Sequence, residues 1–328
     1  MSVPLLTAAS ECARTLVVVG PTASGKSGLA IALAEGLISA DRPAEIVNAD
    51  SMLVYRGMDI GTAKPTAEER ARVTHHLVDI LDVTETATVA EFQTRARAAI
   101  ADCHARGVLP IVVGGSALYV RAIVDEFSFP GTDPVVRARL EHELVEVGAE
   151  ALHQRLAALD PAAAAAILPG NGRRIVRALE VIELTGAPFV AQLPERRYQL
   201  PGVRQIGLAI DRPTLDARIE QRVDAMWAGG LVAEVSRLTA LGLRDGLTAS
   251  RALGYRQVLE FLAGEIDEAE ARRRTVVGTR KFARRQDSWF KQDPRITWLA
   301  YDRDDLVDAT LAAAGLMEAG PMRSDVEH

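Results

Sequence analysis

In the first 124 residues, short apolar runs alternate with longer stretches in which apolar residues recur at helical spacing. The runs at 15–19, 44–47 and 109–113 predict buried strands. Residues 26–37 and 91–106 have the helical spacing and predict helices. Strands that alternate with helices in this way are typical of an α/β fold built on a parallel sheet.

The pattern changes between residues 125 and 200, where the strand signal is missing. Asp133-Pro134 and Asp160-Pro161 each place a capping carboxylate before a proline, which is a typical helix start. Apolar residues then recur at helical spacing, as in Ile175, Leu179 and Ile182. We therefore predict a helical insertion over 125–200.

After the insertion, residues 205–210 predict a returning strand, and from there to about residue 298 we expect mostly helix. The core is then discontinuous and consists of 14–124 and 201–302. The ends, 1–13 and 303–328, lack core periodicity, and we expect them to be mobile tails.

Composition narrows the class of protein. The chain has 328 residues, of which 48% are apolar, so it can bury a large core without crosslinks. Its two cysteines lie far apart and its six histidines are scattered or adjacent, which argues against a disulfide framework, a thiolate zinc site and a histidine metal site. With neither a long apolar span nor a basic leader, the sequence predicts a cytoplasmic protein without a membrane segment.

A phosphate-binding loop follows the first predicted strand. The segment fits the pattern G-x-x-x-x-G-K-[ST], in which backbone N–H groups surround an anion at the start of a helix. The lysine supplies a full positive charge, and Ser27 can ligate the Mg²⁺ that accompanies the phosphates. We predict that a polyphosphate contacts the residues of this loop: Gly20, Pro21, Thr22, Ala23, Ser24, Gly25, Lys26 and Ser27. The loop alone does not identify the polyphosphate, and ATP is the default.

Asp50 lies just after the second predicted strand, where α/β sheets place ligands. A carboxylate at this point could bind a metal ion, accept a proton from a nucleophile, or cap the next element. Its position alone leaves the three roles open.

Basic residues are concentrated near the carboxyl end. Residues 272–291 contain eight Lys or Arg residues and one Asp, which gives net +7 in a chain of net −6. Arg273, Arg280 and Arg284 share one helix face and could neutralise RNA phosphates, although a solvated surface helix is the usual outcome for such a run. Arg173, Arg174 and Arg177 form a weaker second cluster in the insertion.

Four motifs then point to a family. They are GPTASGKS at 20–27, NADSMLVYRGMDIGTAKP at 48–65, VGGSALY at 113–119 and SRALGYRQ at 250–257. In order and spacing they resemble the bacterial tRNA dimethylallyltransferases, over about residues 15–300. The resemblance implies a P-loop NTPase-like core with a helical insertion that contacts tRNA.

The resemblance also implies a reaction. The loop would bind the diphosphate of dimethylallyl diphosphate, with Mg²⁺, and Asp50 would accept a proton from the acceptor. That acceptor would be N6 of the adenosine 3′ of the anticodon, in the anticodon stem-loop of tRNAs that read codons starting with U. Such an amino group is a weak nucleophile, so a carboxylate within hydrogen-bond reach would help it to attack.

Further site residues follow from the resemblance. Ser116 stands where the family usually has threonine, and Arg218 or Arg222 would contact the diphosphate; we include all three in the catalytic set. Leu53 stands where many members have glutamine, so a polar contact is not carried over to it. The residues expected to contact tRNA are Asp50, Ser51, Met52, Leu53, Arg137, Arg173, Arg174, Arg177, Arg251, Gly254, Tyr255, Arg256, Arg273, Arg280 and Arg284.

Three alternatives remain at this point. An adenylate isopentenyltransferase would alkylate a free nucleotide, but the helical insertion and the basic run favour tRNA. A small-molecule kinase would use ATP, with Arg173–Arg177 as a phosphate lid, and would leave the DIGTAKP segment unexplained. A non-catalytic P-loop RNA-binding protein would tolerate the loss of Asp50. We expect the protein to act as a monomer.

Overall fold

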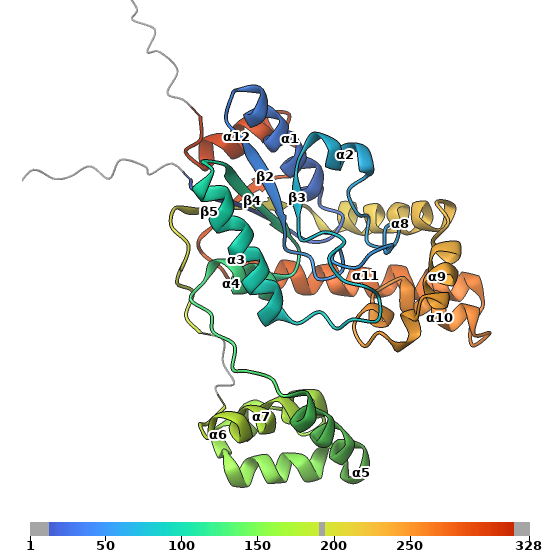
Figure 1. The fold of residues 1–328 in the computed structure, drawn as a ribbon. Helices are drawn as coiled ribbons and strands as arrows, with labels where there is room; N and C mark the ends of the chain where they lie inside the picture. Colours follow the sequence, from blue (N-terminus) through green and yellow to red (C-terminus); the bar gives the residue numbers. More distant parts are fainter. Residues whose placement is uncertain (1–12, 190–193, 318–328) are drawn as a thin grey trace, which may run out of the picture. The chain divides into compact units, whose positions relative to one another are not determined.

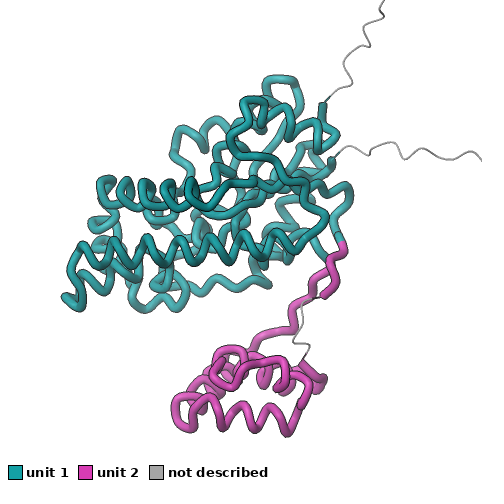
Figure 2. Tube along the Cα trace, turned by 180° about the vertical axis from the view of Figure 1, so that it is seen from behind, with its two compact units in different colours: residues 1–125, 198–328 teal, residues 126–197 magenta. Residues whose placement is uncertain are grey.

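The computed structural model describes residues 13–189 and 194–317. Its contacts divide the chain into two compact units (Figure 2). One unit takes the chain up to Asp125 and again from Tyr198 onward, and the other is Glu126–Arg197. None of the described helices combines the length and the apolar character needed to span a bilayer.

The larger unit is built on a six-stranded sheet in the order β3-β2-β4-β1-β5-β6 (Figure 1). Every pair of neighbouring strands is parallel, which confirms the predicted α/β class. The strands are β1 (Thr15–Val19), β2 (Ala44–Asn48), β3 (His75–His76), β4 (Leu109–Gly114), β5 (Val203–Ala209) and β6 (Ile296–Ala300).

Helices cover both faces of this sheet because alternate strand residues point to opposite sides. Leu16 and Val18 of β1 are buried in one apolar cluster with α1 (Lys26–Ser39) and the partly buried side chains of α12 (Leu306–Ala313). Val17 and Val19 belong to the cluster on the other face, which contains α3 (Val89–Ala105) and α4 (Ala117–Val124). With both faces covered, the strands are apolar throughout rather than alternating.

Along the chain, most of the remaining helices come after β5 and before β6. Asp211 caps α8 (Arg212–Ala228), and Asp267 caps α11 (Glu268–Phe290), each through a backbone amide in the first turn. These two long helices pack against each other (Figure 1). The shorter elements are α2 (Ala67–Arg72), α9 (Leu231–Ala240), η1 (Leu243–Asp245), η2 (Ala249–Arg251) and α10 (Tyr255–Leu262).

The smaller unit contains the helices α5 (Pro134–Leu159), α6 (Pro161–Ala166) and α7 (Gly172–Thr185). The two predicted caps are confirmed, because Asp133 accepts the amides of Val135 and Val136 and Asp160 accepts that of Ala163. Gly148 interrupts α5 with φ 83°. The three helices enclose a core of their own, formed by Leu140, Leu152, Leu156, Ala163, Ala164, Ile167, Ile175, Val176, Ala178 and Leu179.

Two expectations about the carboxyl end were wrong. The stretch expected to be helical as far as residue 298 ends in strand β6, which pairs with β5. Within the expected tail 303–328, residues 306–313 form α12, and Ala314 and Leu316 are buried against the sheet face that α1 covers. The segment is short and its burial depends on a distant helix, so local periodicity did not reveal it. Residues 1–12 and 318–328 of the expected tails lie outside the described residues.

Candidate active site

The phosphate loop joins β1 to α1 as predicted. Gly25, the residue before α1, has φ 97°, and Ala23 has φ 65°, so the loop turns its backbone through left-handed conformations that favour an anion-binding concavity. No described side chain caps the first turn of α1. Ser24 Oγ is buried and has no hydrogen-bond partner among the described residues. A bound phosphate would satisfy these donors.

Lys26 places its ammonium group in the same pocket. Its Nζ donates to the carbonyl oxygen of Pro21 at 3.3 Å. Burial lowers the pKa of Lys26 to about 8, although the negative charge of Asp50 opposes the shift; the positive charge of Arg222 adds to it. An anionic ligand would therefore stabilise the charged form of the lysine and raise its pKa again.

Asp50 follows β2 and is held by its neighbours. Its amide donates to Asn48 Oδ1 at 2.7 Å, and its Oδ1 accepts the amide of Met52 at 2.9 Å. Asp50, Lys26 and Ser27 line one pocket. The carboxyl ends of β1, β2 and β4 are neighbours in the sheet, so the three loops that follow them meet at one edge.

The two arginines in α8 occupy different positions relative to the pocket. Arg222 lines the pocket, and its guanidinium donates to the carbonyl oxygen of Thr62 at 3.2 Å. Burial lowers the pKa of Arg222, against the attraction of Asp50. Arg218 lies one turn away beside Gly25, with its guanidinium 4.4 Å above the ring of Tyr301. Arg222 is thus inside the pocket, and Arg218 borders the start of the phosphate loop.

Part of the lining of this pocket is apolar, and we call this part the apolar wall. Its apolar side chains come from α1, β2, β4 and the two loops after β2 and β3: Ala30, Ile31, Ile46, Leu53, Val78 and Val113. The sequence had not located such a wall. Ser116 is half-buried at the start of α4, just after Gly114 at the end of β4 and Gly115, and is not one of the residues that line the pocket.

Gln286 supports the phosphate loop, and the sequence analysis missed it. Its side-chain Oε1 accepts the amide of Thr22 at 2.8 Å, and it is buried within α11. A Cβ on Gly115 would lie 2.5 Å from its Nε2, so a larger residue there would push the Gln286 side chain out of its present position. The sequence offered one sign of Gln286: it is a neutral amide in a predicted helix that is otherwise rich in arginine.

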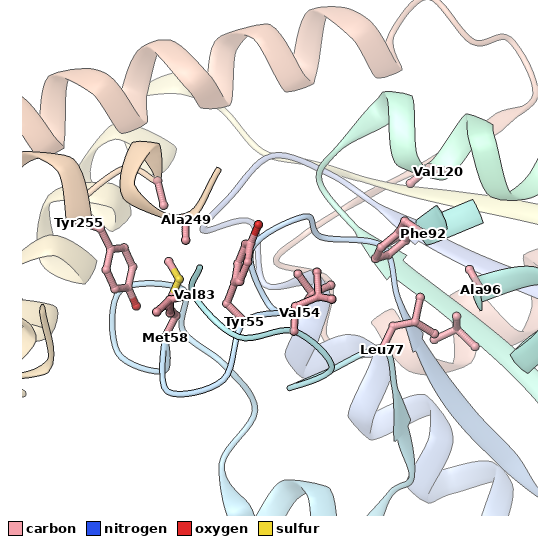
Figure 3. Packing of buried hydrophobic residues seen from close by; sticks show 14 of the residues in the cluster. Val54, Tyr55, Met58, Leu77, Val83, Phe92, Ala96, Val120, Ala249 and Tyr255 are labelled. Atoms are coloured by element: carbon pink, nitrogen blue, oxygen red, sulfur yellow. The ribbon is translucent and has the colours of Figure 1, made fainter. Parts of the chain in front are cut away.

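Tyr255 is expected from the sequence to contact tRNA, but its side chain is fully buried in this structure. Figure 3 shows its ring beside Met58 in the apolar cluster. Its hydroxyl donates to Glu234 Oε1 at 2.6 Å, and the carboxylate of Glu234 also accepts the amides of Asp59 and Ile60. The pair therefore holds the loop that ends in the DIGTAKP motif. In the same segment Gly254 is buried too, whereas Arg251 and Arg256 are exposed.

The basic residues of the expected stripe on α11 are paired with acids that lie outside residues 272–291. Arg273 pairs with Glu270 at 2.6 Å, Arg280 with Glu220 at 2.8 Å, and Arg284 with Asp216 at 3.4 Å. The count of net +7 missed these partners because two of them belong to α8. Lys281 and Arg285 are exposed on α11, and none of the described ion pairs involves them.

In the smaller unit, Arg137 and Arg177 serve a buried carboxylate. Both donate to Glu180 Oε2, and Arg177 does so at 2.7 Å. Burial works to raise the pKa of Glu180, but the hydrogen bonds from these arginines and Thr132 lower it overall. The expected tRNA contact of these two arginines would therefore compete with an internal ion pair. Arg173 and Arg174 are exposed.

A phosphate loop, a fixed carboxylate and two half-buried cations around one pocket define a P-loop protein that binds a phosphorylated substrate. The model of the family "IPP transferase" matches residues 53–293. The chain therefore belongs to the IPP transferase family, and the resemblance seen in the sequence is confirmed.

Individual relatives agree with this assignment. The chain is 64% identical to the tRNA dimethylallyltransferase of Thermobifida fusca over 297 residues, which are 90% of this chain and 93% of the relative. It is 63% identical to that of Kineococcus radiotolerans over 89% of this chain and 93% of the relative. The crystal structure of the tRNA isopentenylpyrophosphate transferase of Bacillus halodurans is similar with a TM-score of 0.66 and 39% identity, over 92% of this chain and 96% of that one.

Proposed function

We propose that this enzyme transfers the dimethylallyl group of dimethylallyl diphosphate to N6 of an adenosine in tRNA. One observation carries the proposal beyond the family name: a single pocket contains the lysine of the phosphate loop, a fixed carboxylate and an apolar wall. A donor with a charged diphosphate and a short hydrocarbon chain matches both the charged and the apolar parts of this pocket's lining. A nucleoside triphosphate would not need the apolar wall next to its phosphates.

The diphosphate is the leaving group in this reaction. The amides of the loop, Ser24 Oγ, Lys26 and Arg222 would bind its oxygens, and Arg218 would contribute from the edge of the loop. Negative charge grows on these oxygens as the C–O bond breaks, so fixed donors and cations stabilise the transition state. The apolar wall would enclose the allylic chain and exclude water, which would otherwise compete as the acceptor.

Mg²⁺ is proposed as the accompanying ion. Ser27 lines the pocket and offers a hydroxyl oxygen; an oxygen donor of this kind suits Mg²⁺. When bound, the ion would neutralise part of the diphosphate charge.

Asp50 is proposed as the base. The lone pair of N6 forms a bond to C1 of the donor while the C1–O bond breaks, and its electron pair leaves with the diphosphate. The proton lost from N6 passes to the Asp50 carboxylate. Asn48 and the Met52 amide hold the backbone and one oxygen of Asp50, which fixes the carboxylate before the acceptor arrives.

The acceptor is proposed to be the adenosine 3′ of the anticodon, in tRNAs that read codons starting with U. That base must leave its stack to reach a pocket at the sheet edge. Ser51, Met52 and Leu53 lie half-buried beside Asp50. The exposed Arg251, Arg256 and Arg173 remain the proposed contacts to the anticodon stem-loop. We expect the enzyme to act as a monomer in the cytoplasm.

The proposal is tested with isotopically labelled dimethylallyl diphosphate. Purified enzyme and Mg²⁺ are incubated with an unmodified anticodon stem-loop, with the same stem-loop lacking that adenosine, or with AMP. Label on the complete stem-loop alone supports the proposal. Label on AMP alone would identify an adenylate isopentenyltransferase, and ATP turnover without label on any acceptor would identify a kinase.

A further inference from the structure

Three potential metal ligands meet away from the phosphate loop. Glu45 comes from β2, His76 from β3 and Cys103 from α3. Their ligand atoms all lie within 4.8 Å of one another. Cys103 is buried, and the other two side chains are half-buried. Because each ligand comes from a different element, the spacing of cysteines and histidines in the sequence gave no sign of this cluster.

The distances in the cluster are close to those around a tetrahedral ion. Cys103 Sγ lies 3.5 Å from Glu45 Oε2 and 3.9 Å from His76 Nε2. Ligand atoms bound to Zn²⁺ at its usual bond lengths are about 3.3–3.6 Å apart. To reach this range, the 2.6 Å separation between His76 Nε2 and Glu45 Oε2 must lengthen, and the 3.9 Å separation between Cys103 Sγ and His76 Nε2 must shorten slightly.

We propose that Glu45, His76 and Cys103 form a binding site for a thiophilic divalent cation of the Zn²⁺ type. Thiolate, imidazole and carboxylate are the ligands that such ions select, whereas Mg²⁺ does not prefer sulfur. Three protein ligands leave a fourth position for water. On binding, the ion replaces the thiol proton of Cys103, which is released to solvent.

The neighbouring Arg106 fits this role as a support of the carboxylate. Its Nη1 donates to Glu45 Oε1 at 2.8 Å, on the oxygen that does not face the cysteine and histidine. Its Nη2 now donates to Oε2 and to Cys103 Sγ, the latter at 3.8 Å, and Nε donates to Asp102 at 2.8 Å. An ion between Oε2 and Sγ would therefore displace Nη2 from both atoms and leave the guanidinium with Glu45 Oε1 and Asp102 as partners. The bond to Oε1 would then orient the ligating carboxylate.

Strand β3 links the proposed metal site to the active pocket. Strand β3 is only two residues long, and an ion on His76 would tie it to β2 and α3. His75, the other residue of β3, lines the pocket that holds Lys26 and Asp50. Occupancy of the proposed site would therefore stabilise one wall of the pocket.

Metal titration tests the proposal on the full chain. A Cys12→Ser background removes the other cysteine, and Co²⁺ is used as a spectroscopic probe in the presence of excess Mg²⁺. We expect one equivalent to bind with a thiolate-to-cobalt charge-transfer band, and Zn²⁺ to displace it. Cys103→Ser should abolish the band, and both Cys103→Ser and His76→Asn should weaken Zn²⁺ binding more than about 100-fold, because even the loss of an outer partner costs 10- to 100-fold.

His142→Asn is the matched control, since His142 is an exposed histidine that pairs with Glu146 outside the cluster. It should leave the band and the affinity unchanged. Thermal unfolding adds a second measurement: Zn²⁺ should raise the melting temperature of the background and of His142→Asn but not that of Cys103→Ala. Absence of the band in the folded background protein, or equal Zn²⁺ affinity with and without Cys103, would overturn the proposal.

Discussion

The backbone amide of Thr22 donates to Gln286 Oε1 at 2.8 Å, although the two residues are 264 positions apart. Thr22 belongs to the phosphate loop and Gln286 to α11, so this bond joins the diphosphate site to a helix near the end of the chain. The same side chain fills the space beside Gly115. One buried amide therefore holds together two of the loops at the edge of the sheet.

Removing this acceptor should weaken the loop. In Gln286→Leu the Thr22 amide remains buried without a partner, which costs about 1–3 kcal/mol. We expect affinity for a non-reactive prenyl thiolodiphosphate to fall by about 5- to 150-fold, measured by calorimetry. Gln292→Leu makes the same change at an exposed position just beyond α11 and should have no effect. Equal affinities in the two variants would contradict a role for Gln286 in shaping the loop.

Asp50→Asn should separate chemistry from binding. The amide keeps an oxygen for the Met52 amide but cannot accept the N6 proton, so transfer should slow by about 10²- to 10⁴-fold. Diphosphate binding should change little, as measured with the thiolodiphosphate. Asp82→Asn, at an exposed carboxylate paired with Arg56, is the control. A parallel loss of diphosphate affinity in Asp50→Asn would instead assign Asp50 to the metal ion.

The pKa of Lys26 predicts how binding depends on pH. Since burial lowers this pKa to about 8, the free enzyme loses the ammonium charge as pH rises through 8. Anion binding favours the charged form, so the dissociation constant should rise above pH 8 by up to about tenfold per pH unit. In Lys26→Arg the guanidinium remains charged over this range, and the rise should disappear whatever the absolute affinity. A persistent rise in that variant would mean that another group is responsible.

Tyr255→Phe should affect stability rather than RNA binding. The variant removes a buried hydrogen bond to the Glu234 carboxylate, of a kind worth about 1.5–3 kcal/mol. Urea unfolding should show this loss while the dissociation constant for tRNA stays unchanged. Arg256→Ala, at the next and exposed residue, should do the opposite. A weakened tRNA complex in folded Tyr255→Phe would show that this segment opens to the RNA.

The ion pairs of α11 predict which of its basic residues contact tRNA. Lys281→Ala with Arg285→Ala should reduce the salt dependence of tRNA binding by about one unit of slope per residue, because these side chains have no acidic partner among the described ion pairs. Arg280→Ala with Arg284→Ala removes the same charge but takes it from pairs with Asp216 and Glu220, so a smaller change is expected. Filter binding over a range of salt concentrations measures both effects. A larger effect of the second pair would mean that Arg280 and Arg284 contact tRNA, as the sequence predicted.

The sequence by itself determined the features that depend on neighbouring residues. The turn of the phosphate loop, the capping carboxylates of Asp133 and Asp160 and the apolar strands follow from local backbone and solvation rules, and each was found where predicted. The family motifs also showed which segments of the sequence form the loops of the site. The position of Asp50 after a parallel strand was also enough to place it near Lys26.

Only the tertiary structure decided which side chains are buried, which are paired, and which line the pocket. Tyr255 is buried and bonded to Glu234, Arg280 pairs with an acid on another helix, and residues 306–316 pack beside α1. Arg222, rather than Arg218, enters the pocket, and Glu45, His76 and Cys103 meet from three elements. Burial and charge pairing depend on residues that are distant in sequence and become neighbours only when the helices and the sheet pack, so local pattern and charge counts could not reveal them.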